Sequence, residues 1–561
     1  MLRINELRLP LEHAAPALEL AILKKLDIPK AALIDFSVFK RSYDARKKNA
    51  MLFVYSVDVN VHDEAAVLKK LRSGVGKSDA AIKISPDTQY HFVGHASANA
   101  LSKPRPLVVG FGPCGIFAAL ILAQMGLRPI VIERGKPVRE RTQDTWGLWR
   151  KKTLNPESNV QFGEGGAGTF SDGKLYSQIK DPRYLGRKVM SEFVKAGAPP
   201  EIMFVSKPHV GTFRLVGVVE RMREEIIALG GEVKFQHRLA DVLIENGVLR
   251  GATLLDVEHG RTSELRTDHL VLAVGHSARD TFEMLHARGV YMEAKAFSIG
   301  FRIEHPQSLI DRARLGVNAG NPLLGAADYK LVHHAANGRS VYSFCMCPGG
   351  TVVAATSEEN RVVTNGMSQY SRNERNANAG IVVGISPDDY PGGPLAGIAF
   401  QRHWESLAFQ AGGGTYEAPG QLVGDFLAGR ASTAFGEVEP SYKPGVHLAD
   451  LSASLPDYAI AAMREAIPAF DKQIRGYGMH DAVLTGVETR TSSPLRMTRG
   501  QDFQSVNVKG LYPAGEGAAY AGGILSAGVD GIKVAEAVGR SLLGMAESQD
   551  DSGWKDSGGS A

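Results

Sequence analysis

The chain has 561 residues, of which 44% are apolar and 22% charged, and this composition predicts a globular protein of roughly two to four domains. Its net charge of +4 is too small to imply nucleic acid or a membrane surface as the main partner. It has three cysteines and lacks both a signal-peptide pattern and an apolar run of about 20 residues, so we expect a cytoplasmic protein without membrane spans or a disulfide framework.

Residues 1–95 are predicted to form a small separate module. Strand-like alternation and helical spacing follow one another in the order strand, helix, strand, strand, helix, which predicts a ferredoxin-like α+β unit. The first hundred residues hold 15 Lys and Arg against 11 Asp and Glu, so the net charge lies there. The basic cluster from Lys40 to Lys48 would face an anionic partner or would simply be a solvated strand end and turn.

Residues 96–106 are rich in small residues and contain two prolines, which predicts a linker. The stretch PLVVGFGPCGIFAALILAQMGLRPIVIERG then predicts a strand, a glycine-rich turn, a helix and a second strand. Gly110 permits the tight turn, Gly112 lets the backbone approach a pyrophosphate, and Gly115 lets the helix pack closely on the strands. The helix beginning at Pro113 would offer free N–H groups and its dipole to the phosphates.

Glu133 ends the second strand, 23 residues after Gly110. A carboxylate at this position accepts hydrogen bonds from ribose hydroxyls and repels a 2′-phosphate, so the motif predicts FAD or NAD rather than NADP. We assign the neighbouring Arg134 to the same cofactor site. The alternative is a chance glycine turn in an α/β domain.

The segment FGEGGAGTFSDGK holds five glycines. A backbone without projecting side chains can run close to a flat ring or a phosphate, so residues 163–168 are predicted to contact a flavin, with Gly165, Gly166 and Ala167 at the contact. The alternative is a flexible surface loop. Residues 297–480 are less periodic and rich in Gly and Pro, and we interpret them as an inserted cap domain.

The C-terminal segment KGLYPAGEGAAYAGGILSAG is a second glycine-rich turn. With it, the chain resembles FAD-dependent oxidoreductases of the glutathione-reductase fold, and more closely a group of bacterial, largely uncharacterised FAD-dependent dehydrogenases. The resemblance is carried by residues 159–175, 271–280, 342–350 and 488–497 and by the C-terminal turn, and it covers most of the chain. It implies that Gly515 and Glu516 contact the ribityl–phosphate arm of FAD, with Glu in place of the commoner Asp. It also implies that Gly275 ends a strand at the cofactor and that Gly523 and Ile524 begin a helix aimed at the flavin.

Four residues are candidates for chemistry. Cys345 and Cys347 form a C-x-C pair that would either exchange electrons with a disulfide or serve as structural thiols about 7 Å apart along an extended strand. Arg490 would grip an anionic substrate or the FAD phosphates, or it would belong to a surface ion-pair network. His276 follows the strand-end glycine and would transfer a proton or make a structural hydrogen bond. No metal site is expected.

These inferences predict an α/β protein with a Rossmann-like FAD-binding domain. This domain would have three layers, in the order β, β and α, and a mostly parallel sheet. Its two segments, residues 107–296 and 481–545, would flank the cap, and residues 546–561 would be a disordered tail. The predicted activity is hydride transfer between flavin N5 and a small-molecule substrate under the cap. NAD(P)H would act only as a transient electron donor, because no second dinucleotide motif is present. The alternatives are a flavoprotein that binds RNA through its basic N-terminal module and a non-catalytic FAD-binding scaffold.

Overall fold

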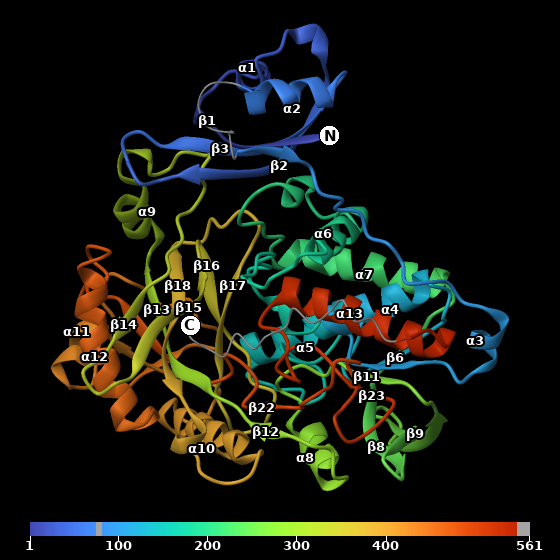
Figure 1. The fold of residues 1–561 in the computed structure, drawn as a ribbon. Coiled ribbons are helices and arrows are strands. Elements are labelled where there is room, and N and C mark those ends of the chain that lie inside the picture. The colour runs from blue at the N-terminus through green and yellow to red at the C-terminus, as the bar shows by residue number, and fades with distance from the viewer. Residues whose placement is uncertain (74–80, 547–561) are drawn as a thin grey trace.

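The computed structural model describes residues 1–73 and 81–546, so the predicted tail from residue 547 onward lies outside the described residues. Figure 1 shows a small N-terminal module beside a larger body in which two sheets lie side by side. Among the helices of residues 1–73 and 81–546, none is long and apolar enough to cross a membrane.

The N-terminal module is a four-stranded antiparallel sheet with two helices. Its elements follow the predicted order, and a short final strand that the sequence analysis did not identify pairs with β1. The strand order is β2-β3-β1-β4. The elements are β1 (Leu2–Pro10), α1 (Ala17–Leu26), β2 (Leu33–Asp44), β3 (Leu52–Val61), α2 (Glu64–Ser73) and β4 (Ile82–Ile84).

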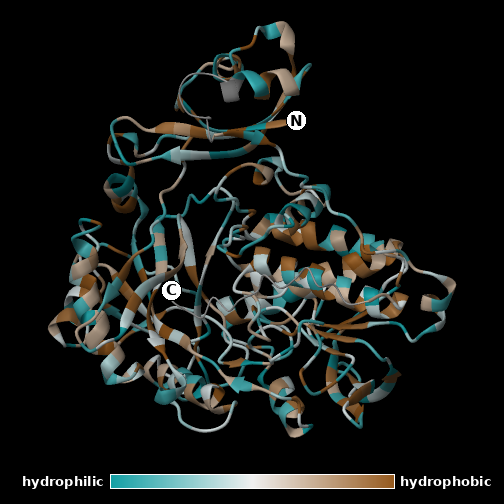
Figure 2. Cartoon of the chain, viewed as in Figure 1, coloured by the Kyte–Doolittle hydropathy of each residue, from teal (hydrophilic) through white to brown (hydrophobic). Residues whose placement is uncertain are grey.

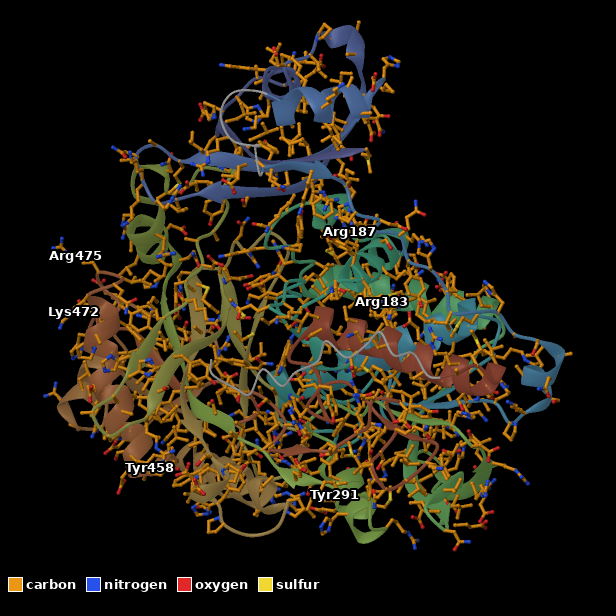
Figure 3. The ribbon with its side chains drawn as sticks, in the orientation of Figure 1. Arg183, Arg187, Tyr291, Tyr458, Lys472 and Arg475 are labelled. Carbon is orange, nitrogen blue, oxygen red and sulfur yellow. The ribbon has the colours of Figure 1, made fainter. Side chains whose placement is uncertain are left out.

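The module contacts the larger body through the free edge of β2. The Arg41 amide donates to the Phe204 carbonyl at 2.6 Å, and the Ser206 amide donates to the Arg41 carbonyl at 2.9 Å. The guanidinium of Arg187, labelled beneath the module in Figure 3, lies 4.5 Å from the centroid of the Phe39 ring. Backbone pairing and a cation–π contact therefore fix the module in place.

The basic cluster Lys40–Lys48 is partly engaged in contacts within the chain. Besides the backbone pairing of Arg41, the ammonium of Lys48 donates to the Ala313 carbonyl at 2.7 Å. The guanidinium of Arg46 pairs with Asp44 at 2.9 Å. These contacts tie part of the cluster to the chain itself.

A five-stranded parallel sheet forms the centre of the larger body. Its order is β23-β11-β5-β6-β7, so strands from both ends of this body pair side by side. The strands are β5 (Leu107–Val109), β6 (Ile130–Glu133), β7 (Glu232–Phe235), β11 (Leu270–Leu272) and β23 (Leu511–Pro513). The predicted linker 96–106 contains a short helix, α3 (Ala98–Ser102), which Ser97 caps by accepting from the Ala100 amide.

Alternate residues of this sheet face two different layers. Val108, Val131 and Val271 share a core with the helices, whereas Leu107 and Leu270 share one with an antiparallel three-stranded sheet. The chain thus forms helix, parallel-sheet and antiparallel-sheet layers, and Figure 2 shows apolar residues gathered in the helices. The helices are α4 (Pro113–Gln124), α5 (Val138–Lys151), α6 (Leu185–Lys195), α7 (Thr212–Ala228) and α13 (Ile524–Leu543), and the antiparallel strands are β8 (His237–Glu245), β9 (Val248–Asp256) and β10 (Arg261–Arg266).

The predicted cap is built on a seven-stranded mixed sheet of order β14-β15-β18-β13-β21-β19-β20. Its central strands β13 (Phe297–Pro306) and β18 (Asn376–Ile385) are buried along nearly their whole length. Strands buried on both faces lack the period-two alternation, which explains why this region appeared irregular in the sequence. The remaining strands are β14 (Val332–His334), β15 (Ser340–Cys347), β19 (Ala418–Leu422), β20 (Val446–Leu448) and β21 (Val483–Glu488).

The boundary expected at residue 480 does not coincide with an edge of this sheet. Strand β21, expected in the second FAD segment, pairs with β13 and β19. The other strands and α-helices described in the body form two short sheets and five α-helices, beside short 3-10 turns. They are β12 (Glu293–Ala294) with β22 (Leu495–Arg496), β16 (Gly350–Ala354) with β17 (Thr364–Ser368), and α8 (Arg279–Ala287), α9 (Gln307–Leu315), α10 (Ala396–Ala411), α11 (Val423–Ala428) and α12 (Asp457–Asp471).

Candidate functional site

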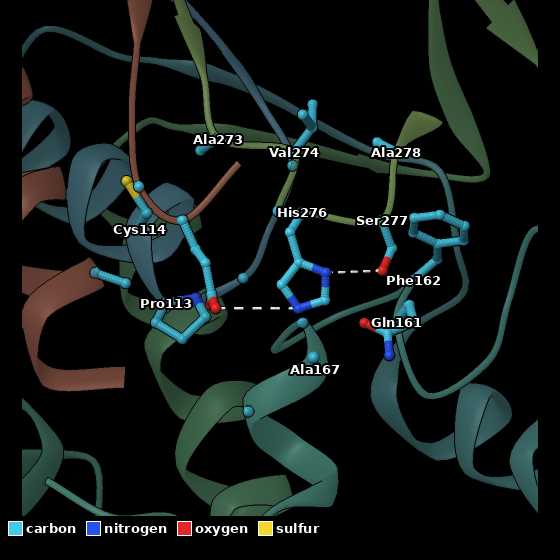
Figure 4. Close-up of a pocket in the computed structure, with 18 of the residues that line it drawn as sticks. Pro113, Cys114, Gln161, Phe162, Ala167, Ala273, Val274, His276, Ser277 and Ala278 are labelled. Atoms are coloured by element: carbon cyan, nitrogen blue, oxygen red, sulfur yellow. Dashed lines mark hydrogen bonds and ion pairs between the residues drawn. The ribbon is translucent and has the colours of Figure 1, made fainter. Parts of the chain in front are cut away.

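A cavity of about 370 Å³ lies between the parallel sheet and the cap sheet. Its walls include the segments that follow the carboxyl ends of β5, β6, β11 and β23, which is where open α/β sheets bind their ligands. Residues of β15, β17 and β21 close it from the cap side. The volume lies in the range of roughly 300–1,000 Å³ found for small-molecule sites. Figure 4 shows the wall around His276.

The first glycine-rich turn is packed too tightly for side chains at two positions. A Cβ on Gly115 would lie 1.9 Å from the Gly110 carbonyl oxygen, and a Cβ on Gly110 would lie 2.4 Å from the Ala273 oxygen. Gly110, Gly112 and Pro113 line the cavity, whereas Gly115 lies behind it. Gly115 thus allows the helix to pack on the turn, and Gly112 presents bare backbone to the cavity.

Two helix N-termini meet at this wall. Gly112 is the N-cap of α4 and Gly523 is the N-cap of α13, and neither helix has an acidic residue in its first turn. The helices touch backbone to backbone, because a Cβ on Gly531 would lie 2.3 Å from the Cys114 oxygen. Gly523 and Ile524 line the cavity. The free N–H groups and the two dipoles therefore favour an anion here.

Glu133 holds the backbone around the turn. Its buried carboxylate accepts from the amides of Phe111 at 2.8 Å, Gly135 at 2.9 Å and Gly163 at 2.8 Å. A carboxylate has about four acceptor positions, so one position remains for the ribose hydroxyl that the sequence analysis predicted. Glu133 therefore shapes the site as well as lining it.

Arg134 lines the same end of the cavity. Its guanidinium donates to Glu157 at 2.8 Å and to Asp280 at 2.9 Å, and it lies 4.1 Å from the centroid of the Phe162 ring. Burial alone would lower the pKa of Arg134, but the charges of Asp280 and Glu157 outweigh it and raise that pKa. Arg134 is thus a fixed cation in the wall.

Only part of the glycine-rich loop 163–168 reaches the cavity. Gly166, Ala167 and Gly168 line it, and Gly165 does not. A Cβ on Gly165, where φ is +85°, would lie 2.1 Å from the Thr169 hydroxyl oxygen. Gly165 is therefore required for packing behind the wall. The predicted contact with a flat ring would be made by the three residues that follow Gly165.

Charged residues that immediately follow this loop were not identified from the sequence. Asp172 and Lys174 both line the cavity, and their Oδ2 and Nζ atoms lie 3.4 Å apart. Arg372 also donates to Asp172, at 2.9 Å. Burial alone would raise the pKa of Asp172, but the charges of Lys174 and Arg372 outweigh it and lower that pKa. The signal was present as the SDGK end of the glycine segment.

His276 lies in the wall with a neutral ring. Burial, and then the nearby charges of Arg490 and Arg279, lower its pKa to about 3. Its Nδ1 lies 3.0 Å from the Ser277 hydroxyl and its Nε2 lies 4.0 Å from Glu516 (Figure 4). The ring is therefore uncharged at neutral pH, and both of its nitrogens face polar side chains.

Glu516 faces the cavity, as do Gly515 and Gly275. Burial raises the pKa of Glu516 to about 7, against the opposing charge of Lys295. The acid that binds the backbone at this strand end is instead Asp530 of α13, which accepts from the Gly515 amide at 2.7 Å. Glu516 is thus left with a carboxyl group that exchanges its proton near neutral pH.

Arg490 is part of a buried network rather than of a surface one. Its guanidinium donates to Glu405 at 3.0 Å and to the hydroxyls of Ser357 at 2.7 Å and Ser277 at 3.1 Å. Arg279 donates to the same Glu405 carboxylate at 2.7 Å. Although Arg490 touches the cavity, its donors are committed within the protein, so it positions the wall rather than gripping a free anion.

The C-x-C pair does not have the extended geometry expected from the sequence. A register shift between Phe344 and Cys347 forms a bulge in β15, and Cys345 has a left-handed φ of +41°. Cys345 lines the cavity, whereas Cys347 is buried behind it. The neighbouring Glu488, which had no predicted role, also lines the cavity, and burial raises its pKa to about 7.

Comparison with known protein families gives two matches. Residues 296–491 match the family described as FAD-dependent protein, C-terminal domain-like. Residues 1–60 match a domain of unknown function, DUF8436. The first match covers all seven strands of the mixed sheet, and its end at residue 491 includes β21 in that unit.

An uncharacterized protein of Clostridium beijerinckii is 51% identical over 537 residues, covering 95% of this chain and 98% of that protein. Solved structures are more distant. A geranylgeranyl bacteriochlorophyll reductase-like protein of Thermoplasma acidophilum is 13% identical, covers 79% of each chain and has a TM-score of 0.35. A flavoprotein/dehydrogenase of Cytophaga hutchinsonii is 13% identical, covers 80% of this chain and 81% of its own, and has a TM-score of 0.35.

Proposed function

The chain belongs to the same family as the Clostridium beijerinckii protein, and we propose that it is an FAD-dependent oxidoreductase. The main support is that the N-termini of α4 and α13 meet at the carboxyl ends of a parallel sheet. Neither helix has an acidic residue in its first turn. The match of residues 296–491 to an FAD-dependent protein domain supports the same cofactor. The substrate would be a small molecule in the part of the cavity closed by the cap.

The residues around the cavity fit FAD. Gly112, Pro113, Gly523 and Ile524 would hold the diphosphate at the two helix ends. The remaining acceptor position of Glu133 suits a ribose hydroxyl. Three glycines of the cavity wall have open space in front of them, because a Cβ there would meet no atom within 4 Å. They are Gly275, Gly522 and Gly523. Gly166 to Gly168 would lie beside a flat ring.

Bound FAD would supply two-electron hydride chemistry, and the chain would supply binding, orientation and proton handling. Glu488 and Glu516 are suited to giving or taking a proton, because the pKa of each is raised to about 7. The neutral ring of His276 would hold the wall beside Glu516. Lys174 would present a positive charge to the substrate. NAD(P)H remains a proposed transient electron donor.

Anaerobic titration of the purified protein tests this function. The account predicts a yellow protein whose two visible flavin bands are bleached by NADH, NADPH or an organic substrate, and restored by an oxidant. Rapid bleaching by one nicotinamide would establish a reductase, and bleaching only by an organic substrate would establish a dehydrogenase. A flavin that stays oxidised with every reductant, dithionite excepted, would contradict an oxidoreductase and leave a cofactor-binding scaffold.

A further inference from the structure

The bulge in β15 gives the two cysteines different solvent exposure. Cys345 is half-buried and forms part of the cavity wall beside Phe344, while Cys347 is fully buried. The Cys347 thiol turns back to donate to the Cys345 carbonyl at 3.3 Å. Bulges re-aim side chains, and this one replaces the extended geometry that would hold the two cysteines about 7 Å apart.

Two buried cations flank the pair. The Arg302 guanidinium donates to the Cys345 carbonyl at 3.1 Å and approaches the Cys347 sulfur at 3.7 Å. The Lys174 ammonium donates to the carbonyl of Met346, the residue between the cysteines. Arg302 comes from β13 and Lys174 from the end of the glycine-rich segment, so the fold brings two cations from distant parts of the chain to this pair.

The acids that face this cluster are largely neutralised. Asp172 pairs with Lys174 and with Arg372. Glu488 lies 3.3 Å from Arg302, and its raised pKa leaves it partly protonated near neutral pH. Glu516 is the remaining carboxyl whose pKa responds to Cys345, and it too is raised to about 7. The net field at the sulfurs is therefore positive.

The interaction with the Cys347 side chain lowers the pKa of Cys345 to about 5, and the charges of Lys174 and Arg302 add to this effect against burial. The same interaction raises the pKa of Cys347. Near neutral pH the pair thus holds one thiolate, facing the cavity, and one thiol behind it. Burial instead raises the pKa of Cys114, which lies in the phosphate turn. A thiolate is the form that attacks disulfides.

We propose that Cys345 and Cys347 form a redox-active pair that reduces a small disulfide in the cavity. The Cys345 thiolate attacks one sulfur of the disulfide, forms a mixed disulfide and releases one thiolate. Cys347 then attacks the Cys345 sulfur, releasing the second thiolate, which takes the Cys347 proton. The pair becomes a disulfide as the substrate gains two electrons. Two electrons and one proton from reduced FAD restore it, and only this last step rests on the proposed function.

Exchange with bis(2-hydroxyethyl) disulfide tests the pair on the full-length protein. Mass spectrometry is expected to show a Cys345–Cys347 disulfide in the wild type. Cys347→Ser should stop at a stable mixed disulfide on Cys345, and Cys345→Ser should form neither product. A wild type that stays reduced, or an adduct that forms as fast on Cys347 in the Cys345→Ser variant, would overturn the proposal. These readouts do not need FAD, so a protein that cannot bind FAD but still reacts with the disulfide would overturn only the proposed function.

The pH dependence of iodoacetamide labelling tests the thiolate. From pH 6 to pH 8 the rate at an ordinary thiol of pKa about 8.5 rises roughly 75-fold, whereas the rate at Cys345 should rise less than about 3-fold. Lys174→Met should increase this ratio about 3-fold or more, and Lys174→Arg, which keeps the charge, should change it less. Cys114 serves as the internal comparator in each digest. An ordinary 75-fold rise at Cys345 in the wild type would contradict the proposal.

Discussion

The two ends of the cavity are built in different ways. The phosphate end is made of backbone: glycines, two helix N-termini, and the Glu133 carboxylate that holds amides of the turn in place. The cap end is made of side chains, with Lys174, Cys345 and Glu488 brought together from segments far apart in the chain. At the phosphate end, a substitution of a packed glycine disturbs the backbone itself. At the cap end, single side chains can be changed without moving the backbone.

The phosphate end should show the largest effect. Gly115→Ala places a Cβ 1.9 Å from the Gly110 oxygen, so we expect the turn to open and FAD affinity to fall about 100-fold or more, a loss of about 2.7 kcal/mol. Flavin released per chain and equilibrium FAD binding measure it. Gly393→Ala is the matched control, because its Cβ would meet no atom within 4 Å. Equal flavin content in the two variants would show that the turn is not built as described.

The buried network behind the cap end should show the next effect. Glu405→Gln leaves Arg279 and Arg490 without their shared carboxylate, so we expect the free energy of unfolding to fall by about 3 kcal/mol. Denaturant unfolding measures it. Glu358→Gln, at the more exposed edge of the same network, should cost about 1 kcal/mol or less. A smaller cost at Glu405 than at Glu358 would contradict the assigned burial.

A pH series on unfolding tests the raised carboxyl pKa at the cap end. Glu488 has a pKa of about 7 in the folded chain against about 4.3 when unfolded, so the folded state retains a proton that the unfolded state releases. Its stabilising contribution is complete below pH 4.3 and is lost as pH rises through 7. Glu488→Gln should flatten the fall in stability between pH 5 and pH 8 by about 2–3 kcal/mol. An unchanged slope would mean that the pKa of Glu488 in the folded chain lies outside the range from pH 5 to pH 8.

The smallest effect is expected away from both ends, at the N-terminal module. Arg187→Met removes one of two cations at the Phe39 ring, while Arg3 stays 3.4 Å from its centroid, and should cost about 0.5–1 kcal/mol of stability, with flavin content unchanged. Thermal unfolding and flavin analysis measure the two quantities. Arg187→Lys, which keeps the charge, should cost less. Loss of flavin in Arg187→Met would show that the module acts on the cavity.

The phosphate end was the part most open to prediction from sequence. Gly110, Gly112 and Glu133 are contiguous with the strand and helix that they join, so their spacing carries the geometry. The geometry of the cap end could not be predicted from sequence. Cys345 reaches the cavity through a bulge where β15 pairs with β18, and Arg490 is held by Glu405, which lies 85 residues away in the chain. Lys174 was missed although it ends the glycine segment, because a single charge there does not show that the side chain faces the cavity.

The most direct test of the account is the flavin content of the purified full-length protein. The account predicts one FAD per chain, released on denaturation and identified as FAD rather than FMN, with the visible spectrum recovered when FAD is added back. A folded protein that carries no flavin and binds none when FAD is supplied would contradict the central claim, whatever the cysteines do.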